Sequence, residues 1–153
     1  MDVQTWELLS YVVTVVGLPL AIVVFLYEQH KERDNEEEEV YQLLSDNYQD
    51  FLKIALDNPD LRLFSKEKIP AFTEAERERL LIVFSMLVSL FERAYLLLYE
   101  EHMSGRQRRR WASWEDYMRE WCQRSDFRNE LPHLLDGEDA DFKKYIQKLV
   151  VEL

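Results

Sequence analysis

The chain has 153 residues, the size of one ordinary domain, and a formal net charge of −11. This negative charge disfavours general binding to nucleic acids, and we expect no DNA partner. The single cysteine, Cys122, excludes an internal disulfide and is typical of a reducing compartment.

An apolar segment near the N-terminus predicts a transmembrane helix that contacts the lipid bilayer. Within residues 6–27 the only charged residue is Glu7, and a helix over residues 8–27 is roughly 30 Å long, the thickness of a hydrocarbon core. The flanking sequence lacks the basic region and the cleavage site of a signal peptide. Because Lys31 and Arg33 follow the segment and no basic residue precedes it, we expect a single-pass protein of the cytoplasmic membrane, with the N-terminus outside.

The remainder of the chain predicts an all-α fold. Apolar residues recur every three or four positions, and no strand pattern or internal repeat is present. We therefore expect a transmembrane helix over residues 1–28, a charged helical stalk over residues 29–40 and an antiparallel helical bundle in the cytosol over residues 41–153.

Start and stop signals divide the cytosolic part into helices. The stalk helix is expected to continue to Asn58-Pro59, because the residue before a proline avoids the α conformation. Thr73 and Glu76 form a capping-box pattern that opens the next helix, which we expect to end near Met103. Its apolar run LLIVFSMLVSLF favours a buried core helix, and a second transmembrane span is the alternative.

Three further helices are predicted beyond Gly105. The first covers residues 107–123 and places four large side chains on one face that we expect in the core: Trp111, Trp114, Met118 and Trp121. Ser125 is expected to cap a short helix that ends near Pro132, and Asp139 to cap the last helix.

Several segments, in order, resemble a known family: YQLLSDNYQDFLKIALDNPDLRLF, TEAERERL, FERAYLLLYE, WEDYMREWCQRSDFRNEL and DFKKYIQKLV. Together they are similar to a widespread, functionally uncharacterised family of bacterial membrane-anchored helical proteins. This family usually has acidic residues where the chain has RQRRRW. In size and topology the chain more distantly resembles the small membrane accessory protein of RNA-targeting type VI CRISPR systems, which implies a pore-like oligomer in antiviral defence.

Small or hydroxyl-bearing residues recur along one side of the predicted span. They are Ser10, Thr14, Gly17 and Ala21, spaced four, three and four apart, and at α-helical rotation they form one narrow stripe. Such a stripe lets helices approach closely in lipid, so it predicts a homo-oligomer interface or a pore lining; chance scatter is the alternative. Pro19 predicts a kink of the kind found in pathway-lining helices, or is simply tolerated there.

Two clusters of like charge lie outside the span. The acidic one is Glu36, Glu37, Glu38 and Glu39, and the basic one is Arg106, Arg108, Arg109 and Arg110. Both clusters are locally unfavourable, the first by self-repulsion and the second by opposing a helix dipole. One hypothesis is that the two clusters pair between protomers. Another is that the arginines bind a protein partner, or the phosphates of lipid or of RNA, with Trp111 as a stacking ring for an RNA base. The remaining alternative is that both clusters are solvated, charged faces.

Ionisable residues in the apolar helix predict a buried polar network rather than catalysis. Glu92 and Tyr95 fit the FExxYxxxY pattern of the resembled family, and we expect Glu92, Arg93, Tyr95 and Arg128 to form an ion-pair network. A ribonuclease pair of Arg93 and His102 is nine positions apart, too far for one helical turn. The histidine and cysteine spacings predict no metal site, and we expect no cofactor.

These patterns predict a non-enzymatic, single-pass membrane protein that homo-oligomerises and forms a pore or perturbs the membrane in CRISPR-linked antiviral defence. The alternatives are a membrane-tethered RNA-binding or ribonuclease-like protein and a tethered adaptor for a cytosolic partner.

Overall fold

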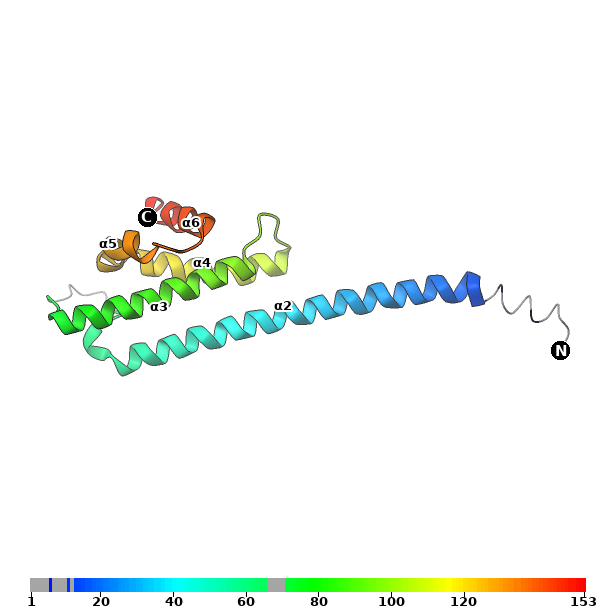
Figure 1. Cartoon of the computed structure of the whole chain (residues 1–153), viewed down its shortest axis with the longest axis horizontal. Coiled ribbons are helices and arrows are strands. Elements are labelled where there is room, and N and C mark those ends of the chain that lie inside the picture. The colour runs from blue at the N-terminus through cyan, green and yellow to red at the C-terminus, as the bar shows by residue number, and fades with distance from the viewer. Residues whose placement is uncertain (1–5, 7–10, 12, 66–70) are drawn as a thin grey trace. The chain divides into compact units, whose positions relative to one another are not determined.

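The computed structural model describes residues 6, 11, 13–65 and 71–153 and is all-helical, with no strand among these residues (Figure 1). The chain divides into two compact units, Met1–Val40 and Tyr41–Leu153. The predicted all-α class is confirmed.

A π-helix opens the described part of the first unit. This helix, η1, spans Val13–Gly17 and is followed directly by the α-helix α2, Leu18–Asp57. Pro19 lies in the first turn of α2, and because η1 runs directly into α2, the missing backbone N–H of the proline removes a hydrogen bond at this junction. The proline explains why a new helix segment starts here.

The far end of α2 confirms the predicted stop. The helix ends at Asp57, and Pro59 begins the short 3-10 helix η2, Pro59–Leu61. The Asn58 side-chain amide donates a hydrogen bond of 2.8 Å to the carbonyl of Ile54, which satisfies one of the last acceptors of α2.

The helix α3, Glu74–Leu98, begins with the predicted capping box. The Glu76 carboxylate accepts from the Thr73 backbone at 2.7 Å, and the Glu76 backbone donates to the Thr73 hydroxyl at 3.3 Å. The predicted end near Met103 is wrong, because Tyr99 is extended at φ −83° and ψ 127°. Its ring instead packs on Tyr95, Trp111 and Tyr145.

The helix α4, Gly105–Cys122, has a second capping box that the sequence interpretation missed. Ser104 and Gln107 exchange the same two contacts, at 2.9 and 3.3 Å, so α4 begins at residue 105 rather than 107.

The last two helices are α5, Ser125–Leu134, and α6, Ala140–Val151. The prediction for α5 needs correction: Arg124 is its N-cap residue, Ser125 is its first helical residue, and Pro132 lies inside the helix. The Asp139 cap of α6 is confirmed, since its carboxylate accepts from the backbones of Asp141 and Phe142 at 2.9 and 3.0 Å.

In the second unit, α3 and α4 both pack on α5 and α6 (Figure 1). Ring contacts of Trp114 and Trp121 also join α4 to the end of α2. The predicted core residues of α4 are buried: Trp111, Trp114, Met118 and Trp121. Among the described residues one helix, α3, is long and apolar enough to cross a membrane by length and composition. One side of α3 is nevertheless buried in this core, with Phe84, Leu87 and Ala94 fully covered.

Candidate functional site

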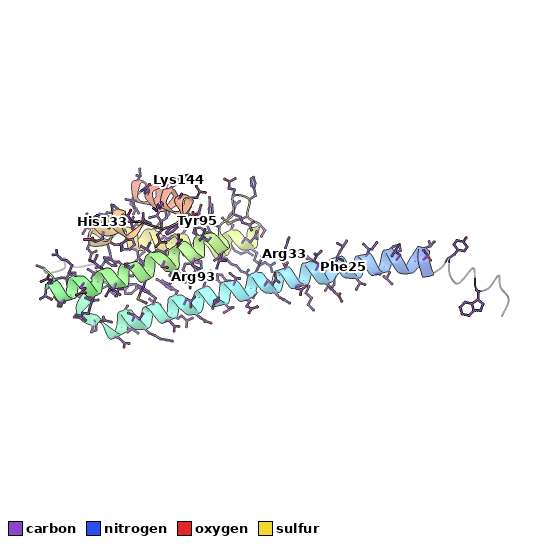
Figure 2. All side chains as sticks on the ribbon, viewed as in Figure 1. Phe25, Arg33, Arg93, Tyr95, His133 and Lys144 are labelled. Atoms are coloured by element: carbon purple, nitrogen blue, oxygen red, sulfur yellow. The ribbon has the colours of Figure 1, made fainter. Side chains whose placement is uncertain are left out.

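The described apolar part of the first unit exposes nearly all of its large side chains. From Val15 to Tyr27 the large apolar residues are between 47% and 69% exposed, and Figure 2 shows Phe25 among them. No charged residue interrupts this surface, which continues around the helix instead of forming one stripe. An uninterrupted apolar surface of this kind is unusual for a helix in water.

The stripe of small residues falls partly in the π-helix. Thr14 and Gly17 lie in η1, whereas Pro19 and Ala21 lie in the first turn of α2; Ser10 lies outside the described residues. A π-helix has i to i+5 hydrogen bonds and turns less per residue than an α-helix. The step from Thr14 to Gly17 therefore departs from the α-helical rotation that was assumed, and the stripe stays a prediction.

The acidic cluster lies on α2 within the first unit. Glu36, Glu38 and Glu39 are exposed and Glu37 is half-buried. Residues 28–40 hold seven acidic side chains and only two basic ones, Lys31 and Arg33. This segment therefore carries a dense negative charge.

The basic cluster lies in the first turns of α4. Arg106, Arg108 and Arg109 are exposed, and Arg110 is half-buried with its guanidinium 5.1 Å from the centroid of the Tyr41 ring. The first turn of α4 holds no acidic residue, so the positive end of the helix dipole meets further positive charge. An external anion would lower this electrostatic energy.

Trp111 is not the stacking ring that the sequence suggested. It is only 3% exposed, and its indole N–H donates to the Tyr145 hydroxyl at 3.1 Å. The Tyr145 hydroxyl in turn donates to the Glu115 carboxylate at 2.7 Å, and Arg119 bonds the same carboxylate. These contacts tie α4 to α6 and leave the indole unavailable for an RNA base.

The same contacts shift two pKa values in opposite directions. Burial, reinforced by the hydrogen bond to the Glu115 carboxylate, raises the pKa of Tyr145 far above its usual value. Burial also acts to raise the pKa of Glu115, but the hydrogen bonds from Tyr145 and Arg119 outweigh it, so that pKa is lowered. Glu115 is therefore a charged acceptor and Tyr145 a neutral donor.

The residues of the predicted buried network lie in separate contacts. Glu92 accepts a short hydrogen bond from the Asp139 backbone N–H, whereas Arg128 donates to the carbonyls of Cys122 and Gln123 at 2.7 and 2.8 Å. Arg93 is exposed and Tyr95 belongs to the ring cluster with Trp111; Figure 2 labels both on α3. Glu92 and Arg128 thus each stabilise a helix junction.

Glu138, which the sequence interpretation did not single out, lies beside Glu92. A hydrogen bond to Glu92, with burial and the negative charge of that carboxylate, raises the pKa of Glu138 to about 7. Its neighbour Lys143 acts in the opposite direction. No local sequence signal pairs two carboxyl groups from α3 and from the turn before α6.

Arg124 was also missed. Its guanidinium bonds both oxygens of Asp126 at 3.0 and 2.6 Å, donates to the carbonyls of Arg62 and Leu63, and lies 5.8 Å from the Trp121 ring centroid. The contacts to Arg62 and Leu63 span 62 and 61 positions of sequence, so only the folded chain reveals them.

The last candidates for chemistry are the thiol of Cys122 and possible metal ligands. Cys122 is fully buried, and burial raises the pKa of its thiol to about 11, which keeps it a neutral and unreactive packing group. Among the described residues, no group of three or more His, Cys, Asp or Glu side chains could hold a metal ion.

Comparison with family models, with curated proteins and with solved structures found no match for this chain. The family resemblance therefore rests on the quoted sequence segments alone, and the more distant likeness to the CRISPR accessory protein, which implies the function, rests on size and topology.

Proposed function

We propose that this chain is a single-pass protein of the cytoplasmic membrane that homo-oligomerises and opens a pathway across the bilayer in antiviral defence. The observation that carries the proposal is the exposed, uncharged apolar surface from Val15 to Tyr27. In water this surface would drive aggregation, whereas in a bilayer it is solvated by lipid tails.

Aromatic residues support the position of the proposed span, and basic residues support its orientation. Trp6 and Tyr11 near one end and Tyr27 at the other are 63%, 73% and 69% exposed, as expected for rings at the two headgroup regions. Lys31 and Arg33 follow the apolar segment, which favours residues 41–153 in the cytosol.

A pore requires more than one copy of the chain. A single helix encloses no aqueous path, so a pathway requires several spans that pack side by side through close-approach residues such as Gly17. The more distant resemblance, to the small membrane accessory protein of type VI CRISPR systems, adds the antiviral setting to this proposal.

A charge placed in the apolar surface tests the anchoring. Val16→Arg puts a cation near the middle of the span, which costs about 2.5 to 3.5 kcal/mol in insertion, and should shift the full chain from the membrane to the soluble fraction or to aggregates. Leu43→Arg is the matched control, because Leu43 of α2 is an apolar residue as exposed as Val16 of η1, at 55% against 58%, but lies beyond the predicted span. Equal membrane flotation of both variants would contradict the proposal.

A tethered adaptor that recruits a partner through the arginines is the second candidate, favoured by the exposure of Arg108 and Arg109. The RNA-binding or ribonuclease-like alternative loses its stacking ring with the burial of Trp111. Vesicle leakage separates a pore from an adaptor, since only the pore releases a trapped dye.

A further inference from the structure

Arg108 and Arg109 form a positive surface that nothing nearby on their own helix neutralises. Both side chains are exposed in the first turns of α4. The residues three or four positions away are Ser, Gly, Arg, Trp and Ala, so no carboxylate can pair with them along the helix. The capping box of α4 uses Gln107, a neutral residue, where a glutamate would have offset the charge.

Glu36 and Glu39 form a matching negative surface on α2. They are three positions apart on a helix, both exposed, and therefore lie on the same side. Glu39 has no basic residue three or four positions away, and the surrounding residues 28–40 are strongly acidic. This surface is the chain's own complement to Arg108 and Arg109.

We propose that Arg108 and Arg109 of one copy bind Glu36 and Glu39 of the neighbouring copy in the assembled membrane protein. The inference rests on the proposed function, since it identifies the surfaces that join the oligomer outside the bilayer. The contact is heterologous, with two different surfaces meeting, and repeats of it close into a ring when the rotation between copies allows. Charge complementarity selects this partner, because the same chain supplies both signs at exposed helix positions.

A second copy fits these observations better than RNA. A nucleic acid approaches a chain of net charge −11 against long-range repulsion, and the ring nearest the arginines in sequence, Trp111, is buried. A second copy instead brings the carboxylates that the arginines lack.

Two opposite charge reversals test the contact in the detergent-solubilised full chain. One variant carries Arg108→Glu with Arg109→Glu, and the other carries Glu36→Lys with Glu39→Lys. Each alone should lose the oligomer in a particle-mass measurement, because its contact now joins like charges. Mixing the two during solubilisation should restore a mixed oligomer, since each contact then joins opposite charges again.

The controls separate a charge contact from general damage. Arg108→Lys with Arg109→Lys keeps the charge and should keep the oligomer, and reversal of two exposed cations elsewhere, Lys53→Glu with Arg77→Glu, should leave the particle mass unchanged. Raising the salt to 1 M should dissociate the wild-type contact, because the Debye length falls to about 3 Å.

Three results would overturn the inference. In the first, the particle mass of the oligomer is unchanged by either reversal. In the second, a chain carrying all four substitutions regains the oligomer while the mixture of the two variants does not, which would place the pairing within one copy. In the third, the arginine reversal abolishes only the binding of labelled single-stranded RNA. Membrane flotation of every variant keeps the outcomes distinct. A wild-type chain in the soluble fraction refutes the proposed function, whereas a floating, oligomeric chain that ignores the reversals refutes only this contact.

Discussion

Glu92 and Glu138 show how a single proton can influence a helix junction. Glu92 accepts from the Asp139 backbone N–H at the start of α6, and Glu138 immediately precedes that residue. Two ionised carboxylates in direct contact repel each other, so the pKa of Glu138 is raised to about 7 and its carboxyl group keeps its proton below that pH. The protonated form donates to Glu92 and leaves Glu92 able to bond the backbone.

The stability of the chain should therefore fall as pH rises from about 4.5 to about 7. The unfolded Glu138 titrates near 4.5 and the folded one near 7, so the folded state binds the proton more tightly, and this favourable contribution is lost between the two values. Glu138→Gln cannot ionise and should flatten the fall in melting temperature between pH 5 and pH 8. Thermal unfolding of the detergent-solubilised full chain measures this melting temperature at each pH, with a substitution of the exposed Glu100, Glu100→Gln, as the control. If the melting temperatures of Glu138→Gln and of the wild type fall equally with pH, the expectation is refuted.

Tyr145 has a polar role that its position in an apolar stripe conceals. Its hydroxyl accepts from Trp111 and donates to Glu115, so Tyr145→Phe leaves a buried indole N–H without its partner. We expect a loss of about 1 to 3 kcal/mol in the free energy of unfolding. Tyr95→Phe removes a hydroxyl from the same ring cluster without touching this chain of bonds. Denaturant unfolding followed by tryptophan fluorescence compares them, and equal losses would argue against the assigned hydrogen bonds.

Several helix boundaries that a local side chain sets were predictable, although the equally local capping box of Ser104 and Gln107 was missed. Thr73, Asp139 and Pro59 act on backbone groups within a few residues, so their sequence signals were sufficient. The end of α3 was not predictable, because Tyr99 is held by rings that include Tyr145, far along the chain. In the candidate site the same distinction holds: composition reveals the apolar segment and the charge clusters, whereas the contacts of Arg124 and Glu138 depend on tertiary neighbours.

Gly17 is the residue of the stripe at which a larger side chain best tests whether the spans pack against each other. It ends η1 directly before α2, and it has no side chain to separate two packed helices. Gly17→Leu should keep the chain in the membrane, since leucine is more apolar, but weaken the association of spans by blocking their close approach. Val16→Leu is the matched control at the adjacent exposed position. Particle mass in detergent measures both, and an undiminished oligomer in Gly17→Leu would remove this stripe from the interface.

For the whole molecule, the number of copies distinguishes a pore from a tether. One span cannot line water, so release of a trapped dye from vesicles requires assembly of several chains. The initial release rate should therefore rise more steeply than in proportion to the amount of protein per lipid, and Gly17→Leu should lower it while binding to the vesicles persists. A tethered adaptor predicts vesicle binding without release at any density. Release in strict proportion to protein would indicate membrane damage by single chains, because assembly would then contribute nothing to the rate.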